Sequence, residues 1–200
     1  MKQTIYLGTL LMALAVAREP IAVTVNYANQ AGVPNRILRA ALNEATFLFN
    51  KADIEITWVD CTSFEGAPEV PRHCRHADPT RFRITFKNDP SIQAVIMGFA
   101  YPTIGSRNRA AVMYSHVTEF ASKHAGLSDV EFILAAAITH ELGHLFFGTT
   151  EHGDGIMLPH WRKAHVKKIG QRGLRFSATQ AETMRAGLAA RQNQDFAMLR

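Results

Sequence analysis

The sequence predicts a single α+β domain. Short runs in which apolar and polar residues alternate, typical of strands, are interleaved with longer runs in which apolar residues recur every three or four positions, typical of helices. The 200 residues are 47 % hydrophobic and 20 % charged, a composition that suits a domain with a buried core. No stretch between these elements is a linker long enough to divide the chain, so one domain is expected.

The first residues of the chain resemble a targeting segment, and they are not expected to be part of the fold. Lys2 precedes the apolar run Ile5–Ala17, which ends in small residues directly before Arg18. These features predict a secretory signal peptide at 1–17 and a mature domain at 18–200, secreted or periplasmic. A membrane span needs about 20 apolar residues, and this run is shorter, so no stable membrane association is expected. Removing Lys2 lowers the formal net charge from +5 to +4 (5 − 1 = 4).

The positive charge falls in two clusters. One cluster comprises Arg72, Arg75, Arg81 and Arg83, and the other comprises Arg162, Lys163, Lys167, Lys168, Arg172 and Arg175. Each is either a solvated face or a surface for an anionic partner such as a cell-surface polymer or an acidic peptide. No nucleic-acid-binding motif accompanies them, so a nucleic-acid partner is not expected.

The chain has two cysteines, Cys61 and Cys74. An oxidising compartment favours joining them, and the export signal places the protein in such a compartment. A disulfide bond between them is therefore predicted.

The elements follow in order along the mature chain. Strands are predicted at Ile21–Tyr27, at Ile54–Trp58 and over Arg81–Lys87, the last half exposed with its arginines facing solvent. The loop from Tyr101 to Asn108 leads to a fourth strand over Ala111–His116. Helices are predicted over Leu38–Phe49, from a capping box of Ser128 and Glu131 through His144, and from a cap of Ser177 with Gln180 to about Gln192.

The second of these helices carries the sequence His140-Glu141-Leu142-Gly143-His144. Residues four apart lie one turn apart on the same helix face, so both imidazoles can reach one ion. Zinc favours nitrogen ligands in tetrahedral geometry, and two histidines supply half of such a site. Glu141 lies about 100° around the helix from His140, beside the ion, where a general base must stand. Because the helix is apolar before the motif, these residues are expected near the interior.

The residues after the motif sharpen this interpretation. Gly148 follows at a point where a helix can end, His152 lies on the irregular stretch beyond it, and Met157-Leu158-Pro159 comes soon after. The pattern resembles the metzincin zinc peptidases, whose motif H-E-x-x-H-x-x-G-x-x-H precedes a turn containing methionine. The turn at Met157 is similar to that of matrixin-type members. Three residues, where the family has two, separate His144 from Gly148 and Gly148 from His152.

The resemblance implies a zincin-like fold with a twisted, mainly parallel sheet, an edge strand, the helix bearing the motif and a C-terminal helix after the Met-turn. It implies one catalytic Zn²⁺ held by His140, His144 and His152, with Glu141 as general base and Met157 as a packing floor. Because the spacing to His152 is lengthened, the oxygen ligands Glu151 and Asp154 stay open as alternatives. It also implies that an edge strand, placed near Ala111–His116, holds the substrate in extended form.

The function that follows is that of a secreted, monomeric zinc-dependent endopeptidase acting on a protein or peptide. Two alternatives stay open at this point: a secreted zinc hydrolase of a non-peptide amide, of the cell-wall type, and a catalytically inactive zinc-binding protein on the same fold. Glu141 argues against the second, because an inactive protein does not need the base.

Overall fold

A computed structural model describes residues 19–64, 66–74, 81–102 and 108–198, and it describes their side chains as far as residue 193. The signal peptide expected at 1–17 lies outside these residues, as does Arg75. Five strands form one sheet in the order β2-β1-β3-β5-β4, in which only β4 runs antiparallel to its neighbour. The strands are β1 (Ile21–Asn29), β2 (Ile54–Asp60), β3 (Arg81–Lys87), β4 (Gly98–Tyr101) and β5 (Arg109–Met113).

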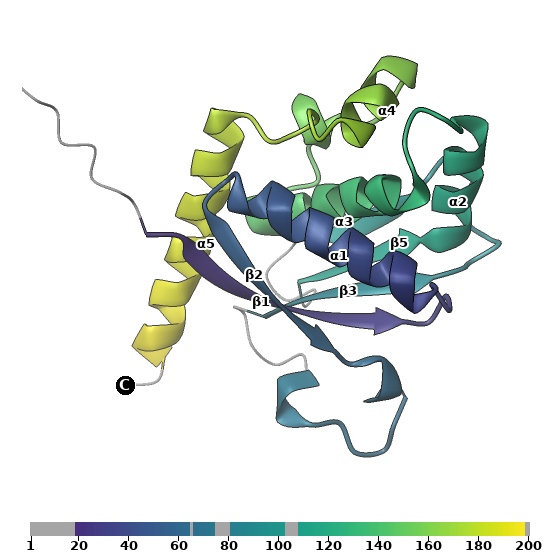
Figure 1. Ribbon diagram of the computed structural model, residues 1–200. Coiled ribbons are helices and arrows are strands. Elements are labelled where there is room, and N and C mark those ends of the chain that lie inside the picture. The colour runs from purple at the N-terminus through teal and green to yellow at the C-terminus, as the bar shows by residue number, and fades with distance from the viewer. Residues whose placement is uncertain (1–18, 65, 75–80, 103–107, 199–200) are drawn as a thin grey trace, which may run out of the picture.

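Helices α1 (Asn35–Asn50) and α3 (Val130–Phe147) pack over one face of this sheet (Figure 1). The apolar stripe of α1 predicted from its spacing is buried. Phe146 of α3 joins the layers, because its ring lies 5.2 Å from that of Phe49 in α1 and 4.8 Å from that of Phe82 in β3. These aromatic contacts fix the depth and orientation of the helix that carries the motif.

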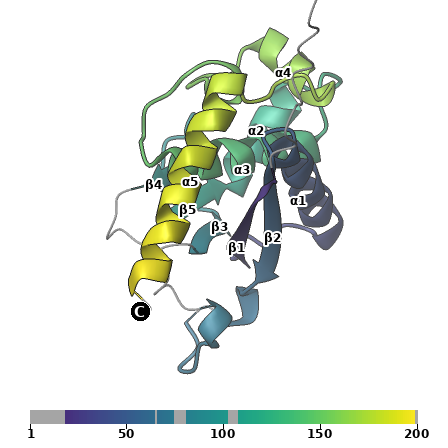
Figure 2. The ribbon, with the colours of Figure 1, turned by 90° about the vertical axis from the view of Figure 1, so that its left-hand side faces the viewer.

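The C-terminal helix α5 (Ala178–Met198) runs beside α3 and close to β1 (Figure 2). The predicted cap is present: Ser177 N donates to Gln180 Oε1 at 2.8 Å, and Gln180 N donates to Ser177 Oγ at 3.3 Å. The helix continues past the predicted end at Gln192, whose side-chain amide donates to Ala22 O at 2.9 Å. That tertiary bond supports a stretch whose own sequence carries no strong helix signal.

Helix α3 is buried almost all around. Within the part of the chain that the structure describes, it is the one helix long and apolar enough to cross a membrane by length and composition, yet 78 % of it is buried inside the protein. Its hydrophobicity is that of a core helix between α1, β4, β5 and α5. The expectation that the motif lies near the interior is therefore confirmed.

The prediction of an edge strand over Ala111–His116 is wrong. Strand β5 ends at Met113 and lies between β3 and β4, so it has neighbours on both sides. Tyr114 begins a helix, α2 (Tyr114–Lys123), which buries Val117 and Ala121 at helical spacing. The edge strand on this side of the sheet is β4, four residues that pair with β5. Such a short strand carries too little alternation to be predicted from sequence.

Three smaller predictions also differ from the structure. Helix α3 begins after Asp129 with no side-chain cap, so Ser128 and Glu131 form no capping box. Arg83 in β3 is buried instead of facing solvent. A short helix, α4 (Lys163–Gly170), lies in a stretch for which no helix was predicted, because Val166 and Ile169 bury a face against the core. Tertiary contacts select these conformations over local preference.

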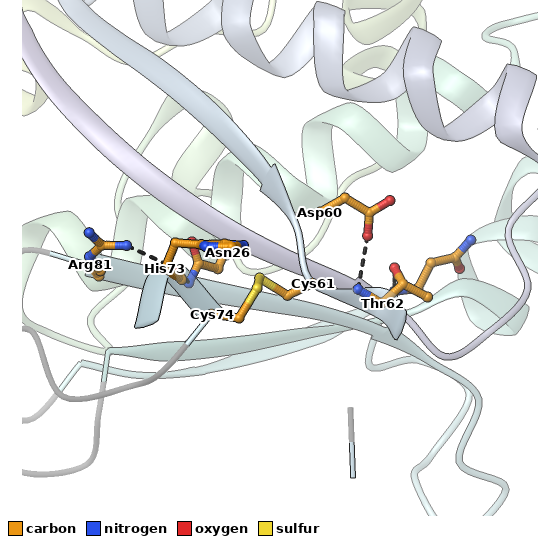
Figure 3. The surroundings of a disulfide bond; sticks show 8 residues. Asn26, Asp60, Cys61, Thr62, His73, Cys74 and Arg81 are labelled. Atoms are coloured by element: carbon orange, nitrogen blue, oxygen red, sulfur yellow. Dashed lines mark hydrogen bonds between the residues drawn. A yellow bond between two sulfur atoms is a disulfide. The ribbon is translucent and has the colours of Figure 1, made fainter. Parts of the chain in front are cut away.

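The predicted disulfide bond between Cys61 and Cys74 is present, with 5.7 Å between the two Cα atoms. It joins Cys61, just after β2, to the short 3-10 turn Arg72–Cys74 (Figure 3). Strand β1 also binds this turn. Asn26 Nδ2 in β1 donates to His73 O at 2.7 Å, and Cys61 N donates to Tyr27 O at 2.8 Å. The disulfide bond thus links the two ends of a segment in the connection between β2 and β3, which extends away from α3 (Figure 1).

Candidate metal centre

Helix α3 brings His140 and His144 together as their spacing predicts. Their Nε2 atoms lie 3.1 Å apart. Each Nδ1 lies beside a backbone carbonyl, that of Ile156 at 2.8 Å for His140 and that of Thr149 at 3.0 Å for His144. A carbonyl oxygen only accepts, so each Nδ1 carries the hydrogen and each Nε2 presents a lone pair.

This arrangement fits a metal cation. Two lone pairs facing each other at 3.1 Å repel unless a proton or a cation lies between them. The separation is close to the roughly 3.3–3.4 Å expected for two nitrogens at tetrahedral positions 2.0–2.1 Å from zinc. Burial lowers the pKa of His140 to about 4, and it also lowers the pKa values of His144 and His152. Neutral imidazole, the form that binds metals, is therefore the form present near neutral pH.

His152 joins the two helix histidines. The ligand atoms of His140, His144 and His152 all lie within 4.8 Å of one another, although His152 itself is exposed. Glu151 and Asp154, the alternatives left open by the sequence, lie outside this group. The three-histidine group is compatible with a zinc site that keeps a fourth position open.

The lengthened spacing is absorbed where α3 ends. The helix continues to Phe147, and Gly148 then adopts the left-handed conformation with φ of 73°. Both Gly148 N and Thr149 N donate to His144 O, at 3.0 and 3.3 Å. The added residues form a turn before His152, which lets the third imidazole return to the helix. The left-handed conformation of Gly148 therefore sets the direction of the turn that leads to His152.

Met157 packs against the helix at Gly143, between the two helix histidines in sequence. A Cβ at Gly143 would come within 2.7 Å of Met157 Sδ. Met157 belongs to a short 3-10 turn, Gly155–Met157, whose Ile156 carbonyl binds His140. The turn Gly155–Met157 thus packs against a glycine of the motif and also holds one imidazole. The sequence indicated the methionine, but the carbonyl partner was visible only in the tertiary structure.

Glu141 points into the space between α3 and the edge strand. It is buried, and burial raises the pKa of its carboxyl to about 8. A dication nearby would favour the charged form instead. Strand β4 crosses close above it, because a Cβ at Gly98 would lie 2.6 Å from both Glu141 Cγ and Oε1. Sequence reasoning missed Gly98, since nothing local marks a glycine that a distant carboxylate approaches.

A cavity of about 760 Å³ opens over these residues. Residues 94–100, which include most of β4, line it, and so does the segment Leu158–Trp161. Helix α2 contributes His116, Glu119, Phe120 and Lys123 at one end. Trp161 packs its ring edge to face with His140 at 6.0 Å, and its buried indole N–H has no acceptor among the described residues. The site therefore combines a metal-ligand group, a buried carboxylate and a cleft between an edge strand and a loop.

Neither known protein families nor curated proteins match this sequence. Solved structures do match the fold. A zinc-dependent peptidase from Methanocorpusculum labreanum superposes with a TM-score of 0.51 at 16 % identity, covering 80 % of this chain and 99 % of that one. An archaemetzincin from Methanopyrus kandleri gives a TM-score of 0.52 at 13 % identity, covering 88 % and 99 %. The chain shares the fold of these proteins.

Proposed function

We propose that this protein is a zinc-dependent peptidase whose ion is held by His140, His144 and His152. The observation that carries the proposal is that three imidazoles converge beside a buried Glu141 on the floor of a cleft. The shared fold with zinc-dependent peptidases supports it. Both the three-histidine group and the shared fold support the proposal without the matrixin-like turn. That turn contributes only the packing of Met157.

Within this proposal, each residue has a defined part in hydrolysis. Zinc, when bound, supplies Lewis acidity that polarises a carbonyl and makes water more acidic. Glu141 accepts a proton from the attacking water and delivers it to the leaving amine. Its place against Gly98 keeps it beside the cleft and shields it from bulk solvent. Ile156 O and Thr149 O hold the rings of His140 and His144 in the orientation that presents Nε2.

The substrate-binding role assigned above to Ala111–His116 passes to β4. Strand β4 is last in the sheet and borders the cavity, so a peptide can add to its outer edge in extended form. The segment Leu158–Trp161 lines the same cavity, so it would border such a strand. A linear polypeptide fits this cleft.

Export remains part of the proposal. The disulfide bond between Cys61 and Cys74 supports it, because such bonds persist in oxidising compartments. Mass spectrometry of the N-terminus of the protein recovered outside the cytoplasm, expected to begin at Arg18, tests cleavage after Ala17.

Glu141→Gln tests the mechanism. The variant and the parent should both carry about one zinc per chain, because Glu141 is not a ligand. The variant should lose about two to four orders of magnitude in rate on a randomised peptide library, since a general base contributes roughly that factor. A variant that hydrolyses like the parent would contradict the role of Glu141. Absence of zinc from protein folded with zinc would overturn the whole proposal.

The same assay separates the peptidase from its alternatives. Parent protein that releases amines from a cell-wall polymer but leaves the peptide library intact acts on a non-peptide amide. Zinc-loaded parent inactive on both is a binding protein.

A further inference from the structure

The segment that follows the Met-turn has a strongly one-sided charge. Residues 155–181 contain six lysines and arginines and no aspartate or glutamate. They include α4 and the loops on either side of it. Such a concentration produces a positive potential that neighbouring residues of the same segment do not offset.

Two of these cations serve the fold. Arg172 Nη2 lies 2.8 Å from Oε2 of the buried Glu44, and its guanidinium stacks on Phe47 and Phe132. Arg175 also stacks on Phe47 and donates from Nε to Arg172 O at 2.7 Å. Burial of Glu44 requires a partner, and Arg172 supplies it.

The other four cations have no such role. Arg162, Lys163, Lys167 and Lys168 are exposed, and none forms an ion pair within the described part of the chain. Helix α4 is held by Val166 and Ile169, which face the core. We call these four residues the basic rim. Because these side chains are exposed and form no ion pair among the described residues, their charge can interact with a partner.

The basic rim begins where the cleft wall ends. Trp161 lines the cavity, and Arg162 follows it directly before α4. The other long segment that lines the cavity, residues 94–100, carries no charged side chain. At the α2 end, Glu119 is paired with Lys123 at 2.6 Å, so it does not balance the rim. Along the chain, the basic rim therefore adds four positive charges directly after residues that line the cleft.

We propose that the basic rim recognises acidic side chains of a polypeptide substrate on one side of the bond to be cleaved. The inference rests on the proposed peptidase function and names its substrate class. A polypeptide is favoured over an unrelated anionic surface because the rim continues the wall of the cleft that would hold the peptide. Eight helical residues span roughly 12 Å, the length of about four extended residues, so a short acidic stretch matches the rim.

The test compares two quenched fluorescent peptide libraries. Both are randomised at the centre; one carries Asp and Glu at the four flanking positions on either side, and the other carries Asn and Gln. The zinc-loaded parent should show about tenfold higher kcat/KM on the acidic library at low salt. The ratio should approach one near 0.5 M NaCl, since screening removes interactions between exposed charges.

Charge reversal identifies the source of the preference. Lys163→Glu/Lys167→Glu should bring the ratio of acidic to neutral kcat/KM to one or below. The matched control is Arg36→Glu/Arg39→Glu, which reverses two exposed charges on α1, away from the cleft wall, and should keep the parent ratio. Equal kcat/KM on both libraries for the parent, or an acidic preference that persists in Lys163→Glu/Lys167→Glu, overturns the proposal.

A binding measurement keeps the inference separate from the peptidase proposal. Fluorescence anisotropy of the labelled acidic library with zinc-loaded Glu141→Gln protein should show salt-sensitive binding that Lys163→Glu/Lys167→Glu weakens about tenfold. If the parent cleaves neither library, the peptidase function is contradicted. The binding result still decides the role of the basic rim in that case. Binding to vesicles with 30 % phosphatidylglycerol, without binding to acidic peptides, would assign the rim to a membrane surface and refute the proposal.

Discussion

His152 differs from the other two histidines in how it is held. His140 and His144 stand on a buried helix, whereas His152 lies on an exposed turn fixed by bonds of its neighbours, such as Gly153 N to Met157 O at 3.0 Å. Asp154 lies two residues on, and its backbone carbonyl accepts from Gln180 Nε2 at 3.2 Å. The third position of the metal site therefore depends on a loop that the core does not bury.

We predict that His152→Ala lowers zinc affinity by about 100-fold or more, because it removes one of three nitrogen ligands. Asp154→Ala should lower it by no more than about tenfold, as for a residue that only supports a ligand. Competition with a chromogenic chelator measures both. Wild-type affinity in His152→Ala together with a large loss in Asp154→Ala would reassign the ligand to Asp154 and leave the peptidase proposal intact.

Gly98 controls the position of Glu141. A methyl group there would lie 2.6 Å from Glu141 Cγ and Oε1 and 2.8 Å from Ala111 O, so either the carboxylate or the strand must move. Gly98→Ala should lower kcat about 10–100-fold, the usual consequence of a misplaced reacting group, with zinc content unchanged. Gly173→Ala is the control, since its new Cβ would lie 3.6 Å from the nearest atom, Lys168 O. Equal kcat in both variants would show that the approach of β4 has no effect on Glu141.

At the scale of the element, the end of α3 sets the geometry of the turn that carries His152. Gly148 has φ of 73°, a conformation that costs a residue with a Cβ about 1 kcal/mol or more. Two backbone bonds to His144 O depend on it. A substitution that strains the backbone at Gly148 should therefore disturb both His144 and His152.

Gly148→Ala should lower the free energy of unfolding by about 1 kcal/mol and also weaken zinc binding. Gly148→Asn should cost less, because asparagine tolerates the left-handed region. Urea unfolding with and without zinc measures both effects. If the two variants are equally stable, the left-handed conformation at Gly148 is not the cause of the loss.

At the scale of the whole molecule, the metal-ligand group and the disulfide bond lie in different parts of the fold. The metal-ligand histidines lie on α3 and on the loop after it, and the disulfide bond lies in the connection between β2 and β3. Zinc binding and the disulfide bond should therefore contribute to stability independently.

The variant Cys61→Ser/Cys74→Ser tests this independence. The bond closes a loop over a sequence separation of 13, for which the chain-entropy relation gives about 3 kcal/mol. Urea unfolding of zinc-loaded protein should show a loss of about that size, and zinc affinity should match the parent. A large loss of zinc affinity would show that the two ends of the molecule are coupled.

The features that the sequence predicted correctly are local. The spacing of His140 and His144 determines that they share a helix face, and alternation in β1, β2 and β3 is itself the signature of a strand. The end of α3 at Gly148 and the cap at Ser177 follow from the preferences of single residues. The two cysteines left one pairing within the chain. Each of these predictions needed only a few neighbouring residues.

The tertiary structure decided what depends on residues far apart in the chain. It placed β4 at the edge, Gly98 against Glu141, and the carbonyls of Ile156 and Thr149 on the two imidazoles. It also buried Arg83 and brought Leu158–Trp161 to the same cavity as β4. The physical reason is that strand order and side-chain packing are chosen by burial and hydrogen bonding summed over the whole domain, and no short window of sequence contains those terms.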